Sequence, residues 1–575
     1  MRTHYPRTPH LPWSPGVSPD DVRIGDALGG LLGREVVVTE KLDGENTTLY
    51  GDGMHARSPD SAHHPSRAWV KALQGRIAHA IPEGWRVCGE NMYARHSLAY
   101  DGLDGFFYGF SVWDGRGRCL DWDGTVRFLR GLGIPVPRVL WRGTLDKRAE
   151  RALRALRLDT ARQEGYVVRT ADGFAAGEFG ARVAKWVRAG HVGTDKHWMH
   201  SAVVPNGLGP AAALWDVRSG GEAGAAELSA AVGLSAPPAA VEPSAELPAD
   251  AGASGPRRPD YGALPPLGDA RLAGALAQLL SGEPRGSLAA RLRDPLGMPL
   301  ARRVADLVGL APNLWRPYPD DSRRSGLIRM SYAADLELLH TVALASARSG
   351  AARDETAWSR LHAEEIRPLE LPRGTFGGLD DDTADRCRAE AREAYAEGRI
   401  GGPDEAVPAT WRWRAADFPR LVQLTAPSGS GKSTFARTVP ADRRISLDDL
   451  REEAGSRSDQ SANRDVLRAA LKRLDTALAA GGTTVWDATS LNRQQRSLVH
   501  AVARRRNALI THAVVLVTPD ELARRNGTRE HPVPPGVLES QLRRFSPPYP
   551  GEAHRTWYIG PGGAVEDTDG TYADE

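Results

Sequence analysis

The spacing of apolar positions changes along the chain and predicts a different kind of structure in each part. Residues 1–205 hold short β-branched and aromatic runs between turn residues, which is typical of strands. The clearest predicted strands are Glu35–Thr39, Thr47–Tyr50, Arg86–Cys88, Phe106–Trp113 and Gly165–Arg169. We therefore expect an α+β domain over residues 1–205.

Residues 206–258 differ in composition and are dominated by Ala, Pro, Gly, Ser and Glu. Such a segment cannot bury enough apolar surface to offset its chain entropy, so we predict a flexible linker. A short helix around residues 222–234 is expected to interrupt it.

The rest of the sequence predicts two further domains. In residues 259–403 apolar side chains recur at three- and four-residue spacing, which is typical of helices. The predicted helices are Asp269–Leu280, Leu300–Val308, Ala334–Ala347 and Ala384–Glu397. In residues 404–575 short apolar strands alternate with helices, the pattern of a parallel α/β sheet. The predicted strands there are Leu421–Leu424, Thr483–Trp486 and Ala513–Val517.

Composition narrows the classes of function for this multidomain α+β and α/β chain of 575 residues. The net charge is +2, so any nucleic-acid surface has to be local. Cys88, Cys119 and Cys387 form no CxxC pair, which argues against a disulfide framework and a zinc site and favours a reducing compartment. An apolar leader and a membrane-spanning run are both absent from the sequence, so we expect a cytoplasmic location.

The heptad Glu40-Lys-Leu-Asp-Gly-Glu-Asn46 is the first candidate site, at the end of a β-branched run. A lysine becomes a nucleophile when burial or neighbouring cations lower its pKa, which would suit Lys41 in a nucleotide pocket. Gly44 permits a tight turn against a ligand. The heptad alone is equally compatible with a surface hairpin, because Asp-Gly is a common turn.

The segments that follow the heptad make a nucleotide site the better interpretation. They are His55-Ala-Arg-Ser58, Gly89-Glu90, Phe107-Tyr-Gly-Phe110, Glu164-Gly-Tyr-Val-Val-Arg169 and Val183-Ala-Lys-Trp-Val-Arg188. Their order over residues 35–200 resembles motifs I, Ia, III, IV and V of the covalent nucleotidyltransferases, which include polynucleotide ligases and mRNA capping enzymes. The details are most similar to the nick-sealing RNA ligases typified by a phage enzyme.

This resemblance implies a chemical role for three residues. Lys41 would attack the α-phosphorus of ATP, expel pyrophosphate and hold AMP as a phosphoramidate. Lys185 would contact the α-phosphate and offset its growing charge. Glu164 would position Mg²⁺ or Mn²⁺, or its waters.

The resemblance also implies a set of nucleotide contacts. Glu90 would bond the ribose, and Phe110 would stack on adenine, with Tyr108 as the second choice. Asn46 and Arg57 would orient the phosphates and the polynucleotide end. Glu40, beside the nucleophile, completes the predicted binding set.

One departure concerns the family's Lys-x-Lys pattern in motif V. Here Val187 occupies the second lysine position, and Arg188 would point to the opposite face of a strand. After this motif the chain continues through His191 and His197 into the predicted linker, and not into the OB-fold of DNA ligases. That favours an RNA ligase; the two histidines are interpreted as packed residues or, alternatively, as substrate contacts.

The second candidate site is the phosphate loop Ala426-Pro-Ser-Gly-Ser-Gly-Lys-Ser-Thr434 between a predicted strand and helix. Backbone N–H groups of such a loop, with the helix N-terminus, cradle phosphates. The predicted ATP contacts are Gly429, Gly431, Lys432, Ser433 and Thr434, with Ser433 also on Mg²⁺. Ala426 replaces the first glycine of the usual pattern.

The sequence after the loop resembles the 5′-hydroxyl polynucleotide kinases, over most of residues 418–550. The supporting segments are Ile445-Ser-Leu-Asp-Asp-Leu-Arg451, Thr483-Thr-Val-Trp-Asp487 and Arg525-Asn-Gly-Thr-Arg529. The resemblance implies Asp448 as general base, Arg451 on the acceptor phosphate and Asp487 on the metal. Arg525 and Arg529 would be lid arginines that neutralise the transferring phosphoryl group. The alternative for Asp448 is an acidic helix N-terminus.

Residues 259–403 contain no motif for healing of a 3′ end. Asp380-Asp-Asp-Thr383 is interpreted as a solvated helix cap. The basic and aromatic cluster there could contact single-stranded RNA or pack on a neighbouring domain. Its members are Trp315, Arg316, Tyr318, Arg323, Arg324 and Arg329.

Together the two resemblances predict a bifunctional enzyme that phosphorylates 5′-hydroxyl RNA ends and seals them to 3′-hydroxyl ends. RNA with 5′-hydroxyl or 5′-phosphate ends would be the partner, and a separate enzyme would heal 3′ ends. The alternatives are a DNA kinase and ligase, a nucleotide-binding scaffold without turnover, and a small-molecule kinase fused to a ligase.

Overall fold

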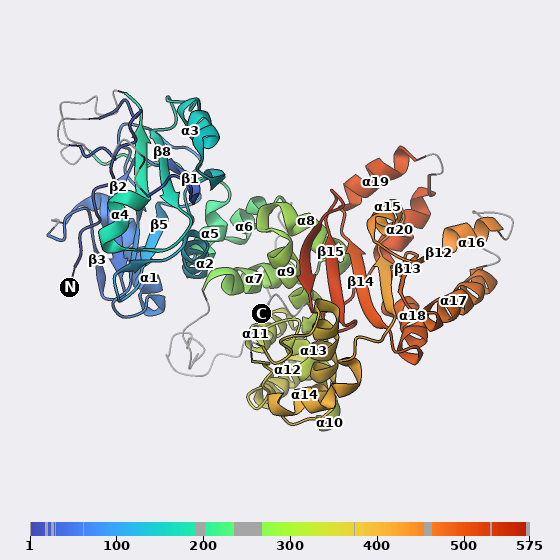
Figure 1. Ribbon diagram of the computed structural model, residues 1–575. Helices are drawn as coiled ribbons and strands as arrows, with labels where there is room; N and C mark the ends of the chain where they lie inside the picture. Colours follow the sequence, from blue (N-terminus) through green and yellow to red (C-terminus); the bar gives the residue numbers. More distant parts are fainter. Residues whose placement is uncertain are drawn as a thin grey trace, which may run out of the picture. The chain divides into compact units, whose positions relative to one another are not determined.

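The computed structural model describes residues 2–17, 21–24, 28, 30–60, 63–189, 202–234, 267–372, 374–453, 463–529 and 532–570. The chain divides into two compact units, Met1–Leu272 and Ala273–Glu575 (Figure 1).

The first unit contains two antiparallel sheets. The first sheet has the strand order β10-β8-β1-β7, with β1 Glu35–Lys41, β7 Val139–Thr144, β8 Gly165–Thr170 and β10 Val183–Val187. The second has the order β3-β2-β4-β5-β6-β9. Its strands are β2 Glu45–Tyr50, β3 Gly53–His55, β4 Arg86–Asn91, β5 Phe107–Trp113, β6 Arg118–Cys119 and β9 Phe174–Ala175.

Strand β1 has a continuous apolar run because both of its faces are covered. Val36 and Val38 pack in one core with Leu11 and Tyr166, whereas Val37 faces a separate cluster with Trp122. The chain then leaves this sheet at Lys41 and enters the other sheet at β2. The predicted nucleophile therefore lies where the backbone crosses between the sheets.

Helices α1 (Ala68–Ile77) and α2 (Trp122–Leu132) contribute to the core of the second sheet. Asp121 caps α2 by accepting from Gly124 N, and Gly133 ends it at a φ of 74°. The other helices of this unit are α3 Lys147–Arg154, α4 Phe179–Arg182, α5 Ala212–Arg218 and α6 Ala225–Ala231. Helices α5 and α6 occupy the start of the predicted linker, whose residues 235–258 lie outside the described part.

The helical region expected over residues 259–403 is present. Its helices are α7 Gly268–Leu279, α8 Arg285–Leu296, α9 Met298–Leu310, α10 Asp320–Ser331, α11 Leu336–Ser346, α12 Gly350–Ala363 and α13 Asp381–Ala396. A short helix, α14 (Ala406–Ala409), follows. Helix α13 builds a core with Phe376 and Trp413.

The sheet of the second unit has the order β12-β13-β11-β14-β15-β16. Its strands are β11 Arg420–Thr425, β12 Arg443–Ser446, β13 Thr483–Asp487, β14 Leu509–Val515, β15 Arg555–Ile559 and β16 Val565–Asp569. The pairing is parallel, as predicted, except that β16 joins β15 antiparallel. This α/β part confirms the predicted fold class.

Helices cover this sheet and complete the α/β part (Figure 1). They are α15 Lys432–Thr438, α16 Leu447–Glu453, α17 Asn463–Ala479, α18 Arg493–Arg505, α19 Pro519–Gly527 and α20 Pro535–Arg544. Within the described residues of either unit, no helix has the length and apolar character needed to cross a membrane.

Candidate active sites

A cavity of about 1170 Å³ in the first unit is lined by residues of both antiparallel sheets. It brings together most of the residues that the N-terminal motifs predicted. These are Glu40, Lys41, Asn46, Arg57, Glu90, Phe110 and Lys185. Residues that are far apart in the sequence thus share one site, because β1, β2, β4, β5 and β10 all contribute to its walls.

Gly44 in the crossing between the sheets has no room for a side chain. A Cβ atom there would lie 2.5 Å from the carbonyl oxygen of Asn91 and 2.7 Å from the Met92 sulfur. Asp43, its neighbour, anchors the turn by accepting from Ser97 N at 2.9 Å and Leu98 N at 3.0 Å. The Asp-Gly pair thus fixes the backbone that carries Lys41.

The Lys41 ammonium forms an ion pair with Glu164, whose side chain is 6% exposed. Burial by itself lowers the pKa of Lys41, but Glu164, Glu90 and Asp43 together outweigh it, so the pKa is raised. This differs from the lowered pKa expected from the sequence. The heptad does not reveal the cause, because Glu164 lies at the entry to a distant strand.

Other polar groups in the cavity are also perturbed. Burial raises the pKa of Glu90 to about 7, against the opposing effect of Lys41. Burial also lowers the pKa of Lys185, despite Asp21 at 3.8 Å. The Oδ1 atom of Asn46 is buried without a hydrogen-bond partner. A buried amide oxygen of this kind fits a ligand that donates a hydrogen bond or a cation.

The two aromatic candidates separate in the structure. Phe110 lines the cavity, but Tyr108 does not. Tyr108 is 7% exposed and its hydroxyl accepts from Asp104 N at 2.7 Å. Arg188 lies outside the cavity lining and donates to Thr160 O at 2.7 Å. It therefore does not replace the missing second lysine of motif V, while His191 and His197 lie outside the described residues.

Sequence reasoning missed the N-terminal segment, of which residues 4–8 line the cavity. The Tyr5 ring packs edge-on against Phe110, with centroids 5.2 Å apart. Further along, Lys185 N donates to Pro9 O at 2.8 Å, so the segment continues along β10. In an extended proline-rich chain the apolar residues follow neither a helical nor an alternating period. The spacing of apolar residues therefore did not predict that this segment lines the cavity.

The second candidate site is the phosphate loop at the carboxyl end of β11. Gly429 and Gly431 have φ angles of 84° and 95°, which favour glycine, and α15 begins at Lys432. Lys432 is 8% exposed. Burial lowers its pKa, while Asp487 and Asp448 oppose that change. Two predicted carboxylates therefore act on the predicted phosphate-binding lysine.

These two carboxylates have different surroundings. The Oδ1 atom of Asp487 is buried without a hydrogen-bond partner, which fits a metal ion or its waters. Asp448 is 47% exposed and accepts from Arg451 at 2.6 Å. Among the described residues, no three His, Cys, Asp or Glu side chains gather as a metal cage.

The two predicted lid arginines are placed differently. Arg525 donates to the carbonyl oxygens of Ser430 at 2.9 Å and Pro561 at 2.8 Å, so its guanidinium supports the phosphate loop itself. The charge of Arg529 contributes to the lowered pKa of Lys432. A further contact was not predicted: the Gln541 side chain of α20 accepts from Ser428 N at 2.7 Å.

Three side chains of the candidate RNA-binding cluster form contacts with other residues of the helical region. Trp315 donates to Ala343 O at 3.0 Å, Arg323 pairs with Glu355 at 3.1 Å, and Arg329 pairs with Glu393 at 2.9 Å. This favours the packed alternative. Asp380 caps α13, as predicted, but Asp382 is not solvated, since it pairs with Arg420 and Arg555.

Comparison with known proteins identifies both nucleotide domains. Residues 34–187 match the RNA ligase family model, and residues 421–548 match the AAA domain model. No curated protein matches the chain.

Solved structures resemble parts of the chain at low identity. A chain of the Pnkp1/Rnl/Hen1 RNA repair complex is 22% identical over 22% of this chain and 44% of its own length, with a TM-score of 0.20. An archaeal ATP-dependent RNA ligase is 16% identical over 33% of this chain and 48% of its own, with a TM-score of 0.25. A Janibacter sp. HTCC2649 sugar kinase is 20% identical over 26% of this chain and 88% of its own, with a TM-score of 0.21. By the family models, the chain carries an RNA ligase domain over residues 34–187 and an AAA domain, which contains the phosphate loop, over residues 421–548.

Proposed function

We propose that the chain is a bifunctional RNA repair enzyme, with a 5′-hydroxyl kinase and an ATP-dependent ligase. The observation that carries the proposal is the cavity in the RNA ligase domain, where Lys41 and Lys185 lie among ligase-motif residues and Lys41 pairs with Glu164. The phosphate loop with Asp448 and Asp487 near Lys432 supports the kinase half. The kinase product, a 5′-phosphate, is the substrate that the ligase requires.

In the ligase reaction the Lys41 amine attacks the α-phosphorus of ATP and pyrophosphate leaves. The pKa of Lys41 is raised in the nucleotide-free site, so the ammonium must lose its proton first. A Mg²⁺ or Mn²⁺ ion held by Glu164 would supply the positive charge that favours the neutral amine. Lys185 offsets charge on the α-phosphate, and Phe110 with Glu90 orients the nucleoside. AMP then passes to the 5′-phosphate, and the 3′-hydroxyl displaces it.

In the kinase reaction Asp448 takes the proton of the 5′-hydroxyl as that oxygen attacks the γ-phosphorus, and ADP leaves. Arg451, which pairs with Asp448, would bind the acceptor phosphate. Lys432 and Arg529 stabilise charge on the transferred group. Asp487 with Ser433 would hold Mg²⁺, which would supply positive charge to the phosphate groups of ATP.

The proposal also defines the context of the reaction. RNA breaks with a 5′-hydroxyl are the substrate, and another enzyme removes any 3′ or cyclic phosphate before sealing. The described cysteines are free and buried, which supports a reducing compartment such as the cytoplasm.

The test uses a nicked RNA duplex with a 5′-hydroxyl, ATP and Mg²⁺. Lys41→Ala should lower joining by about 1000-fold or more and leave phosphorylation intact, because it removes the nucleophile alone. Lys432→Ala should lower phosphorylation, and a supplied 5′-phosphate should restore joining. The matched control is Lys71→Ala, whose side chain is exposed on α1.

Loss of both activities in each variant would contradict the two-site assignment. A matching DNA nick is run in parallel, and faster turnover of DNA would overturn the assignment of RNA as substrate.

A further inference from the structure

Helices α8 and α9 have no catalytic motif, yet they contact the kinase part of the same unit through a buried charged residue. Arg285 of α8 has a side chain that is 11% exposed and pairs with Asp306 of α9, which is 1% exposed. Its guanidinium lies 3.6 Å from the centroid of the Tyr549 ring. It also donates to the carbonyl oxygens of Pro547 and Pro548. A buried arginine with this many partners fixes the segment that it contacts.

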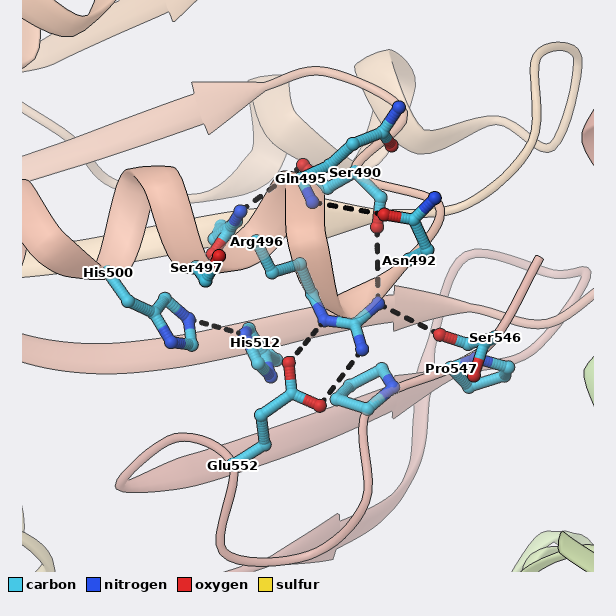
Figure 2. Close-up of polar contacts among 12 residues, drawn as sticks. Ser490, Asn492, Gln495, Arg496, Ser497, His500, His512, Ser546, Pro547 and Glu552 are labelled. Carbon is cyan, nitrogen blue, oxygen red and sulfur yellow. Dashed lines mark hydrogen bonds and ion pairs between the residues drawn. The ribbon is translucent and has the colours of Figure 1, made fainter. Parts of the chain in front are cut away.

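That segment, residues 545–552, is held from another side by Arg496 of α18 (Figure 2). Arg496 is 1% exposed and donates to Glu552 at 2.6 and 2.9 Å and to Ser546 O at 2.8 Å. Proline has no backbone N–H, so the prolines of this segment cannot donate hydrogen bonds to its carbonyl oxygens. These oxygens therefore need donors from other parts of the chain. Two buried arginines from separate helices supply them.

The same segment continues directly from α20, and α20 contacts the phosphate loop. Gln541, one helical turn before Phe545, accepts from Ser428 N at 2.7 Å. A helix is stiff over one turn, so the position of Phe545 sets the position of the Gln541 backbone. The contacts therefore form a continuous path from α8 through Phe545 to the loop that would bind ATP.

Two glycines allow this close approach. A Cβ on Gly286 would lie 2.1 Å from the carbonyl oxygen of Phe545. A Cβ on Gly309 would lie 2.4 Å from the Tyr549 hydroxyl and 2.3 Å from Arg285 Cδ. The first contact is with backbone, which a side-chain rotation cannot relieve, so a methyl group at Gly286 has to displace Phe545.

We propose that α8 and α9 form a clamp that positions α20 against the phosphate loop, with Arg285 and Gly286 as positioning residues for ATP. The clamp gives the helical region a role in the kinase, and the proposal rests on the kinase activity proposed above. It assigns no chemistry to these helices.

The experiment compares Gly286→Ala with Gly326→Ala in the full chain, since a Cβ on Gly326 of α10 meets no atom within 4 Å. Gly286→Ala should raise the KM for ATP in 5′-phosphorylation by about tenfold and change kcat much less, because misplacement of a binding loop weakens ATP contacts. Gly326→Ala should leave both constants unchanged. Lys41 self-adenylation, measured on the same samples, should not change in either variant.

A double-mutant cycle with Gln541→Ala tests the path. If Gly286 acts through Gln541, the two KM effects will be less than additive. An unchanged KM in Gly286→Ala, a fall in kcat alone, or fully additive effects would overturn the clamp. If Gly286→Ala does not fold, Arg285→Lys is measured in its place, against the same outcomes. A wild-type chain that phosphorylates no 5′-hydroxyl would instead refute the proposed function.

Discussion

The protonation state of Lys41 is set by carboxylates before any nucleotide arrives. Burial alone would favour the neutral amine, but Glu164, Glu90 and Asp43 reverse the direction and raise the pKa. The proposed nucleophile is therefore an ammonium in the nucleotide-free site.

Removal of the Glu164 charge should make Lys41 more reactive in the absence of nucleotide and metal. In Glu164→Gln the largest charge that opposes burial is removed, so the pKa of Lys41 should fall. The measurement is the pH dependence of Lys41 modification by an amine-reactive reagent, read by mass spectrometry. Exposed Lys71 in the same samples is the internal control. If wild-type Lys41 reacts as readily as Lys71, the conclusion that the carboxylates keep Lys41 protonated is wrong.

At the scale of elements, the sequence predicted only some of the strands and helices. Strand β1 follows from its run of valines, and α7, α9, α11 and α13 follow from their apolar period, whereas α8, α10 and α12 were not predicted. Pairing could not be predicted in the same way, because β1 lies between β7 and β8, which are distant in sequence. The Lys41–Glu164 contact is a product of that pairing, so only the family resemblance pointed to Glu164.

The N-terminal segment shows a second limit of sequence patterns. Its position is fixed by backbone bonds to Lys185 and by the packing of Tyr5 on Phe110, and neither leaves a period in the sequence. The phosphate loop is the opposite case. Its strand, glycines and helix are contiguous, so the sequence alone was sufficient to locate it.

Helix α18 is joined to strand β14 by a buried histidine pair, His500 and His512, whose Nε2 atoms are 2.9 Å apart (Figure 2). Burial lowers the pKa of His500 to about 4 and that of His512 well below its usual value. Glu552 opposes the change at His500, but Arg496 and Arg504 add to it. Both rings are therefore uncharged at neutral pH.

The second unit should lose stability in acid because the unfolded chain binds protons at these histidines that the folded chain does not. Stability is present above the unfolded pKa of about 6.5 and falls as the pH approaches 4, by about 3 kcal/mol for His500 alone. Urea unfolding of the second unit between pH 7 and 4.5 measures this slope. His500→Phe should be less stable at pH 7 and have a shallower slope; an unchanged slope would contradict the assignment.

At the scale of the whole molecule, the boundary between the units falls inside α7, and the start of that helix is fixed to the first unit. Asp269 accepts from Arg218 at 2.8 Å and from Arg130 at 2.6 Å. The Arg218 side chain is 4% exposed, and Asp269 balances its buried charge. Residues 267–272 therefore belong to the first unit, and the second unit begins after Leu272.

Asp269→Ala should therefore destabilise the first unit and not the second. It leaves the buried Arg218 guanidinium without its carboxylate, a loss of about 2 kcal/mol. Asp172→Ala is the matched control, because Asp172 is 69% exposed and lies 3.7 Å from an exposed Arg34, and a surface pair contributes less than about 1 kcal/mol. Thermal unfolding of the full chain, with Lys41 self-adenylation and 5′-phosphorylation followed as each unit melts, separates the two transitions. We expect Asp269→Ala to lower only the temperature at which self-adenylation is lost. If phosphorylation is lost at a lower temperature as well, the two units do not unfold independently, and Asp269 stabilises more than the ligase part.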